Sequence, residues 1–164
     1  MKNVYLVGGT MGVGKTTICQ QLKRKLPNSV FLDGDWCWDA DPFWVTEETK
    51  KMVLENICFL LNQFIQCSVY DNIIFCWVMH QQEIIDYIVE QLNKTDCKIR
   101  TISLTAKESE LRERLKKDIE EGKRPEDILD RSTERLACYN RLSTVKIDTD
   151  KRSIEDIAEE IAKL

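Results

Sequence analysis

The feature that most constrains the fold is the stretch NVYLVGGTMGVGKTT at residues 3–17, where an apolar run precedes four glycines, a lysine and two threonines. The apolar run is predicted to form a buried strand, the glycines a loop, and residues 16–26 a helix. Glycine admits positive φ and close approach of a ligand. Successive N–H groups form an anion nest, and a helix N-terminus adds partial positive charge. The stretch therefore has the spacing of the phosphate-binding loop, Walker A, at Gly9, Gly14, Lys15 and Thr16.

We expect this loop to bind the phosphates of a nucleotide, although the loop alone does not separate a GTPase, an ATPase and a small kinase. Lys15 is predicted to contact the β and γ phosphates, and the Thr16 hydroxyl to bind Mg²⁺. The alternative is an ordinary glycine-rich turn, which the order of strand, loop and helix disfavours. The predicted nucleotide-binding residues of the loop are Gly9, Met11, Gly12, Val13, Gly14, Lys15, Thr16 and Thr17.

Length, charge and cysteine pattern predict one soluble, cytoplasmic domain. The chain has 164 residues and a net charge of −4 with interspersed signs, which argues against duplex nucleic acid as a partner. Apolar runs such as residues 73–79 are too short to cross a membrane, and the N-terminus lacks a signal-peptide pattern. The seven cysteines form no CxxC pair, so we expect reduced thiols.

Strand-like and helix-like segments alternate along the chain, which predicts an α/β fold with a five-stranded parallel sheet. Thr46 is expected to cap a long helix that runs to about Cys67. Ser153 is expected to cap the last helix. The other predicted strands are residues 29–33, 72–79, 98–104 and 144–148, and the other predicted helices are about 82–92, 107–121 and 126–141.

Two carboxylates follow the second predicted strand, in the stretch FLDGDWCWDADPFW at residues 31–44. In a parallel sheet this position lies beside the phosphate loop, where ligands gather. With extended backbone expected through Asp35, we assign Asp33 to Mg²⁺ and Asp35 to the proton of an acceptor hydroxyl. A solvated Asp-Gly turn is the alternative.

Aromatic residues flank these carboxylates and predict the walls of a small-molecule pocket. Trp36, Trp38 and Trp44 are the predicted wall residues, with core packing as the alternative for any single ring. His80 is the only histidine and directly follows the third predicted strand. We expect it to contact the acceptor, although a lone histidine is more often a hydrogen-bonded structural residue.

Basic residues in the stretch 111–139 suggest a clamp on a phosphoryl group. Arg124 stands beside a Gly-Lys break and Arg135 lies eleven residues further on, as a mobile clamp would need. A solvated charged helix is the alternative reading of most of these charges. The third predicted strand lacks the terminal acid of a Walker B motif, since Cys76 and Met79 stand there.

Taken together, these stretches resemble the small P-loop kinases of the nucleoside-monophosphate-kinase-like group. This group includes adenylate, shikimate, gluconate and adenylylsulfate kinases and chloramphenicol phosphotransferase. The resemblance spans nearly the whole chain and implies a three-layer P-loop NTPase fold, a single domain over residues 1–164, and a helical lid at about 118–135. The segment FLDGD is similar to the one with which several of these enzymes handle Mg²⁺ and the acceptor hydroxyl.

The resemblance also assigns roles to residues near the lid. LRERL resembles the lid entry, which would place Arg114 over the adenine, and Lys151 lies in the loop that borders the adenine in these kinases. RPED followed by ERLACY resembles the lid exit, which would make Arg124 and Arg135 phosphate clamps. Asp118 departs from the pattern, because a second lid-entry arginine is usual there.

These observations predict an ATP-dependent phosphotransferase that uses Mg²⁺ and acts on a small-molecule hydroxyl acceptor. The predicted catalytic residues are Lys15, Asp35, Arg124 and Arg135. No arginine lies between residues 25 and 99 to receive an anionic acceptor, which favours a neutral or cationic one. Two alternatives stay open. One is an ATP-binding sensor with little turnover, favoured by the missing Walker B acid, and the other is a nucleotide kinase.

Overall fold

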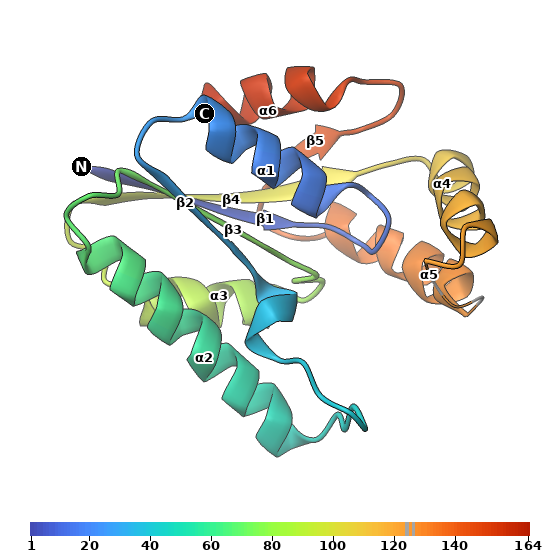
Figure 1. Cartoon of the computed structure of the whole chain (residues 1–164), viewed down its shortest axis with the longest axis horizontal. Coiled ribbons are helices and arrows are strands. Elements are labelled where there is room, and N and C mark those ends of the chain that lie inside the picture. Colours follow the sequence, from blue (N-terminus) through green and yellow to red (C-terminus); the bar gives the residue numbers. More distant parts are fainter. Residues whose placement is uncertain (124, 126) are drawn as a thin grey trace.

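The computed structural model describes residues 1–123, 125 and 127–164 and shows strands and helices in alternation along the chain (Figure 1). The elements are β1 (Lys2–Gly8), α1 (Lys15–Lys25), β2 (Ser29–Asp33), the short 3₁₀ helix η1 (Gly34–Cys37), α2 (Glu47–Gln66), β3 (Asn72–Trp77), α3 (Gln82–Gln91), β4 (Cys97–Thr105), α4 (Glu108–Glu120), α5 (Ile128–Asn140), β5 (Val145–Asp148) and α6 (Ile154–Ala162).

The five strands within the described residues form one sheet in the order β2-β3-β1-β4-β5, and every neighbouring pair is parallel. Helices α1 and α6 cover one face of this sheet, and α2 and α3 cover the other (Figure 1). The predicted α/β fold with a five-stranded parallel sheet is therefore confirmed.

The alternation of buried side chains along β1 explains the three layers. Val4 and Leu6 belong to the hydrophobic cluster shared with α2 and α3. Tyr5 and Val7 belong to the cluster shared with α1 and α6. Because successive side chains of a strand point to opposite faces, a strand buried on both faces must be apolar throughout. The apolar run of residues 4–7 therefore specifies the central strand.

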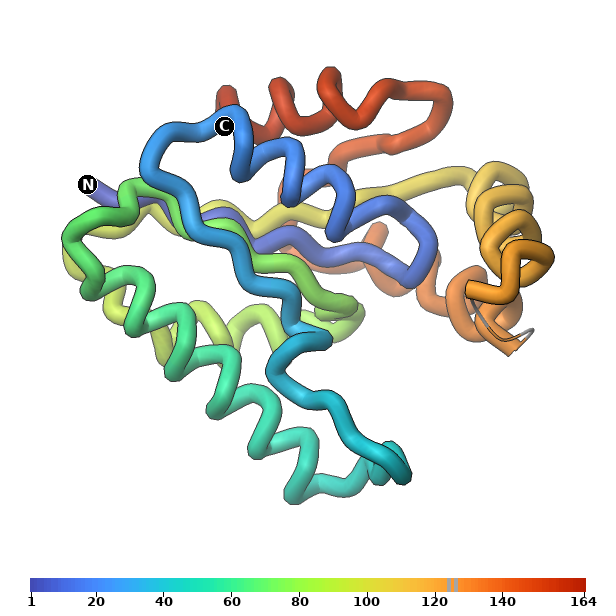
Figure 2. The backbone as a smooth tube through the Cα atoms, in the orientation of Figure 1, coloured from blue at the N-terminus to red at the C-terminus, as the bar shows by residue number. Residues whose placement is uncertain are grey.

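Helices α4 and α5 lie together beyond the carboxyl-terminal ends of the strands (Figures 1 and 2). They enclose a small third cluster of Leu111, Leu115 and Ile128. The charged stretch of the sequence therefore lies at the carboxyl-terminal end of the sheet, as does the phosphate loop. None of the helices in the described ranges has the length and apolar character that a bilayer crossing requires.

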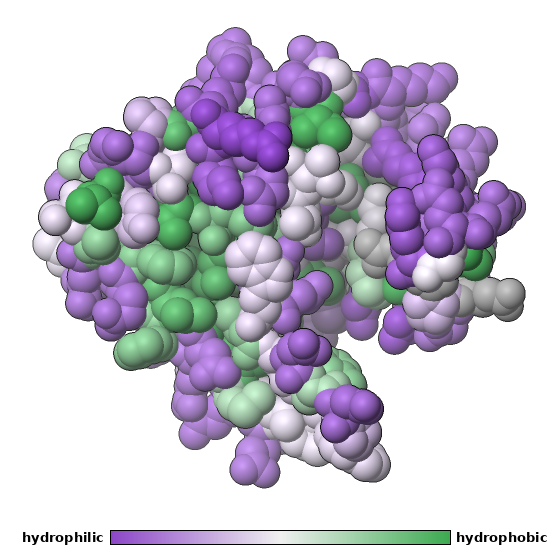
Figure 3. Space-filling model, viewed as in Figure 1, coloured by the Kyte–Doolittle hydropathy of each residue, from purple (hydrophilic) through white to green (hydrophobic). Residues whose placement is uncertain are grey.

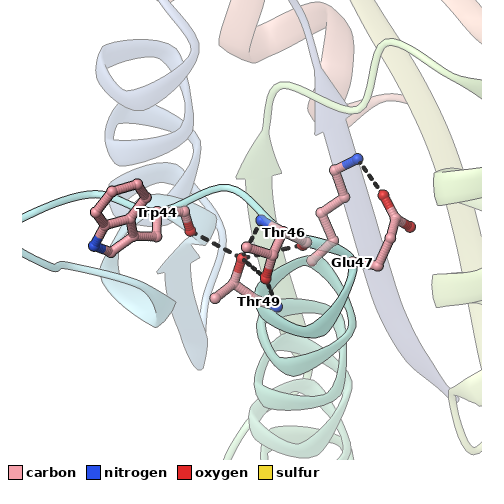
Figure 4. A network of polar contacts seen from close by, with 5 residues as sticks. Trp44, Thr46, Glu47 and Thr49 are labelled. Carbon is pink, nitrogen blue, oxygen red and sulfur yellow. Dashed lines mark hydrogen bonds and ion pairs between the residues drawn. The ribbon is translucent and has the colours of Figure 1, made fainter.

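Helix α2 begins at the predicted cap. The Thr46 hydroxyl oxygen accepts a hydrogen bond from the Thr49 N–H at 3.2 Å, and the Thr46 N–H donates to the Thr49 hydroxyl at 2.9 Å. The Thr49 hydroxyl also lies 2.9 Å from the Trp44 carbonyl oxygen, and Lys50 pairs with Glu47 at 2.8 Å (Figure 4). These contacts fix the direction in which the loop before α2 enters the helix.

The prediction of extended backbone through Asp35 is wrong, because the chain turns into η1 directly after β2. The Asp33 carboxylate accepts a hydrogen bond from the Asp35 N–H at 3.1 Å, which is the local bond of an Asx turn. Gly34 is required for close packing: a Cβ there would lie 2.4 Å from the Trp77 Cγ. Asp33 and Asp35 therefore both lie at the carboxyl-terminal end of the sheet, but a turn joins them in place of the extended backbone that we predicted.

Candidate active site

The phosphate loop presents an open helix N-terminus. Gly12 and Gly14 have φ of 83° and 101°, a region that L side chains rarely adopt. Gly14 is the N-cap of α1, and within the described chain no side chain caps this end and no acidic residue lies in its first turn. Its N–H groups are therefore available to an anion. The Lys15 ammonium donates to the Thr10 carbonyl oxygen at 3.0 Å, across the loop.

Gly9 and Val13 pack between the loop and the sheet and do not line the cavity that lies over the loop. A Cβ on Gly9 would lie 2.8 Å from the Val13 Cγ1 and 3.2 Å from the Leu104 carbonyl oxygen, so the loop backbone packs directly on β4. Val13 is 1% exposed. Gly9 and Val13, both predicted to bind nucleotide, therefore set the conformation of the loop backbone by packing beneath it. Gly12 is tight as well, because its added Cβ would lie 2.6 Å from the Leu115 Cδ2 of α4.

A cavity of about 410 Å³, the nucleotide cavity, lies over the loop. The predicted residues Met11, Gly12, Gly14, Lys15, Thr16, Thr17 and Arg114 line it, together with Asp33, Asp35, Val78 and Asp118. The fold therefore brings most of the predicted nucleotide-binding residues to one space, along with both carboxylates that follow β2.

The two residues predicted to bind magnesium, Thr16 and Asp33, meet in this cavity. The Thr16 hydroxyl donates to the Asp33 Oδ2 at 2.8 Å, and Asp33 is 7% exposed. Hydroxyl and carboxylate oxygens are the ligands that Mg²⁺ takes from proteins when phosphates and water complete its octahedron. In the register of β2 and β3, Asp33 pairs with Cys76, one of the two positions where the sequence lacks the Walker B acid.

The segments predicted to border the adenine also lie together. The Arg114 guanidinium donates to the Thr149 hydroxyl at 3.2 Å and to the Thr149 carbonyl oxygen at 3.1 Å. The Lys107 N–H donates to the Asp150 carboxylate at 2.9 Å. Lys151 follows in the same loop but is exposed and does not line the nucleotide cavity.

A second cavity of about 450 Å³, the acceptor cavity, adjoins the first. Asp35, Met11 and Val78 line both. The surface is hollowed between the loop that precedes α2 and the end that carries α4 and α5 (Figure 3). Of the predicted acceptor residues, Asp35, Trp38 and His80 line this cavity. Trp36 and Trp44 do not line it and are 61% and 68% exposed.

Other lining residues of the acceptor cavity were not singled out by the sequence. Trp77 ends β3, and Arg131 lies one helical turn before Arg135 on α5. The spacing of four residues between the arginines is the signal that places both on one face of a helix. Asp127 pairs with Arg131 at 3.4 Å. Arg135 lines the cavity as expected of a clamp, whereas Arg124 lies outside the described residues.

The surroundings of His80 favour its neutral form. Burial and the positive charge of Arg135 both lower the pKa of His80 below its usual value. Its Nδ1 atom is buried and has no hydrogen-bond partner among the described residues. A neutral imidazole at this place can exchange one hydrogen bond with an uncharged ligand group.

Two buried hydrogen bonds attach α5 to the loops at the carboxyl-terminal end of the sheet. The Thr10 hydroxyl of the phosphate loop donates to the Ser132 carbonyl oxygen at 2.9 Å, and both residues are fully buried. The Tyr139 hydroxyl donates to the Val78 carbonyl oxygen, and burial raises the pKa of this phenol. The helix that carries Arg131 and Arg135 is thus anchored at both the phosphate loop and the end of β3.

Known proteins share the family and the fold of this chain. A family model described as an AAA domain matches residues 6–136 of the chain. No curated protein sequence gives a significant match. Among solved structures, 317 chains match significantly, which makes the fold a common one.

Three solved structures illustrate the likeness. A gluconokinase from Sinorhizobium meliloti 1021 is 18% identical with a TM-score of 0.69, over 97% of this chain and 89% of its own. The Deinococcus radiodurans tunicamycin resistance protein is 18% identical with a TM-score of 0.76, over 99% and 95%. The Mycobacterium tuberculosis APS kinase in complex with AMPPNP and APS is 15% identical with a TM-score of 0.69, over 99% and 95%. The fold is that of the nucleoside-monophosphate-kinase-like P-loop kinases, as the sequence resemblance implies.

Proposed function

We propose that this chain, which belongs to the AAA domain family of P-loop proteins, moves the γ-phosphate of Mg·ATP to a hydroxyl of a small, non-anionic acceptor. One observation carries the proposal: Asp35 lines both the nucleotide cavity and the acceptor cavity. A carboxylate at such a junction can contact a hydroxyl while that hydroxyl faces the terminal phosphate. A kinase-like fold supports phosphoryl transfer as the reaction.

The nucleotide side of the reaction uses the phosphate loop. Lys15 exchanges the Thr10 carbonyl oxygen for the β and γ phosphates, and the N–H groups at the start of α1 bind phosphate oxygens. Thr16 and Asp33 would hold Mg²⁺, which when bound would neutralise phosphate charge. Arg114 lies against the base, beside the loop that contains Lys151.

The acceptor side uses Asp35 and Arg135. The acceptor oxygen attacks the γ-phosphorus, and Asp35 takes the hydroxyl proton. The bond between the γ-phosphorus and the bridging oxygen breaks, so ADP leaves with the bonding electrons. The Arg135 guanidinium binds the migrating phosphoryl group in a fixed fork, with Arg124 as its predicted partner. The lid predicted at about 118–135 would exclude water from the transfer.

The charges of the acceptor cavity support a non-anionic acceptor. Asp35 is the acid at its inner end. The fold adds Arg131 and Arg135 to the lining, which the gap in arginines between residues 25 and 99 does not predict. Arg131 already has Asp127 as a partner at 3.4 Å, and Arg135 serves the phosphoryl group in this mechanism. No guanidinium is then left over for an acceptor anion in the described lining.

A nucleotide-binding sensor is the second candidate. The observation that favours it is the place opposite Asp33 in the sheet, where β3 carries Cys76 and no acid. A sensor would bind Mg·ATP and change conformation with little turnover. The kinase and the sensor therefore differ in product formation and agree in nucleotide binding.

A screen of the purified chain tests the proposal. We would measure ADP release from Mg·ATP across pooled hydroxylated metabolites, with Lys15→Ala as the matched control. Acceptor-dependent ADP release that Lys15→Ala loses is the expected result. Mg·ATP binding without ADP release in any pool would favour the sensor, and efficient phosphorylation of AMP or CMP would favour a nucleotide kinase.

A further inference from the structure

The acceptor cavity continues into a longer groove. A neighbouring cavity of about 720 Å³ lies along α2 and α3 and reaches Lys50 and Lys51. The lining residues that the two cavities share include Trp38, Val45, Trp77, His80 and Arg135. They therefore form one groove that runs from Asp35 outward between α2 and α3. Volumes of this order hold drug-sized molecules.

The inner half of this groove is walled by aromatic rings. The Trp38 and Phe43 rings stack with centroids 4.2 Å apart and an interplanar angle of 28°. Phe43 remains 57% exposed although it lines the cavity. The Trp77 indole packs against Gly34, whose missing Cβ makes room for it. Exposed stacked rings offer a planar apolar partner a face to pack against.

Three of the four described lysines and arginines that line the groove, all except Arg135, pair with an acid three or four residues away in the chain. The paired residues are Lys50 and Lys51 at the outer end of the groove and Arg131, which lies one helical turn before Arg135. The pairs are Lys50–Glu47 at 2.8 Å, Lys51–Glu55 at 3.7 Å and Arg131–Asp127 at 3.4 Å. Exposed pairs of this kind leave little net field for an anionic ligand.

His80 adds a polar contact in the middle of the groove. It lines both cavities, and its buried Nδ1 has no partner among the described residues. An unmet buried hydrogen-bonding atom is costly, so a ligand group that satisfies it gains affinity. An uncharged polar group on the acceptor would suit a neutral imidazole.

We infer that the acceptor is an uncharged, ring-bearing alcohol of drug size. Its hydroxyl lies at Asp35, its planar ring packs on the Trp38–Phe43 stack, and its remaining part extends between α2 and α3 past His80. This inference rests on the proposed function, because it assigns the substrate class of the same site. Polyols and sugar acids lack the apolar surface that these rings would cover.

Binding of three compounds tests the inference. In saturating Mg·AMPPNP, calorimetry would compare naphthylethanol, naphthylacetate, which replaces the alcohol by a carboxylate, and inositol, which has hydroxyls but no apolar ring. We expect naphthylethanol to bind about tenfold more tightly than either of the others. Equal or tighter binding of naphthylacetate or inositol would overturn the inference.

A pair of matched variants locates the ring. Phe43→Ala removes one ring of the stack and should weaken naphthylethanol binding about tenfold. Phe59→Ala makes the same change at an α2 ring that is 63% exposed and outside both cavities, and should leave binding unchanged. Equal affinities of Phe43→Ala and the wild type would also overturn the inference.

Binding of Mg·AMPPNP distinguishes a failure of the acceptor inference from a failure of the proposed function. Mg·AMPPNP binding combined with a preference for inositol overturns the acceptor class and leaves the proposed function standing. Failure of Mg·AMPPNP to bind overturns the proposed function and the acceptor inference with it.

Discussion

Replacing Thr10 by valine would remove one of the two bonds that attach α5 to the sheet edge. The Thr10 hydroxyl is fully buried and donates to the Ser132 carbonyl oxygen at 2.9 Å. Valine keeps the branched shape, so the change opens no large cavity. The Ser132 carbonyl lies inside α5 and keeps its place in the helical hydrogen-bond ladder. The loss is therefore one net hydrogen bond, about 1 kcal/mol of the free energy of unfolding.

Hydrogen exchange locates this loss. A local destabilisation of about 1 kcal/mol corresponds to about fivefold faster amide exchange in α5. Urea unfolding would give the global value. Thr133→Val is the matched control, because within the described residues the Thr133 hydroxyl bonds only to carbonyls of its own helix, at 2.9 Å to Leu129 and 3.1 Å to Asp130. It should leave the exchange of the phosphate loop unchanged.

Unaltered α5 exchange in Thr10→Val, together with a stability within a few tenths of a kcal/mol of the wild type, would refute this reasoning. Arg131 and Arg135 would then be held over the acceptor cavity by other contacts, such as the Tyr139 bond to Val78.

Three further predictions concern the site. Lys15→Ala should cost on the order of 2 kcal/mol of Mg·ATP affinity by calorimetry or appear as lost turnover, and a variant with neither defect would refute the phosphate-loop assignment. Gly34→Ala places a Cβ 2.4 Å from the Trp77 Cγ, so urea unfolding should show a loss of about 1–3 kcal/mol, and a neutral result would contradict the packing. Burial and Arg135 lower the pKa of folded His80, so the unfolded chain binds the proton more tightly; stability should fall below about pH 6.5, less so in His80→Gln. Equal pH dependence in both proteins would show that His80 contributes nothing.

Local patterns made the central part of the fold predictable. The run of residues 4–7 and the glycines after it specify β1, the phosphate loop and the start of α1 because each acts on its own neighbours. The Thr46 cap of α2 and the Ser153 cap of α6 are confirmed for the same reason. The alternative of a solvated Asp-Gly turn after β2 is correct in part: the turn occurs, but Asp33 is 7% exposed and bonded to Thr16, so its carboxylate is not solvated.

Contacts between distant segments were not predictable from one sequence. The Thr10 bond to Ser132 joins residues 122 positions apart, and no local pattern in either segment requires it. Arg131 and Trp77 reach the acceptor cavity through the phase of α5 and the end of β3, which tertiary packing decides. The same holds for Trp36, whose ring meets Phe31 edge-on at 5.4 Å and does not line the cavity. Whether Trp36 or Trp44 contacts an acceptor stays a prediction.

The most direct test of the central claim follows labelled γ-phosphate from Mg·ATP into an acceptor ester in wild type and in Asp35→Asn. The account predicts that wild type forms an ester at a hydroxyl and that Asp35→Asn forms it about two to four orders of magnitude more slowly, the scale of losing a general base. Mg·ATP binding should persist in the variant, because Lys15 and Thr16 are unchanged. Full ester formation by Asp35→Asn, or none by wild type with any hydroxylated acceptor, would contradict the account.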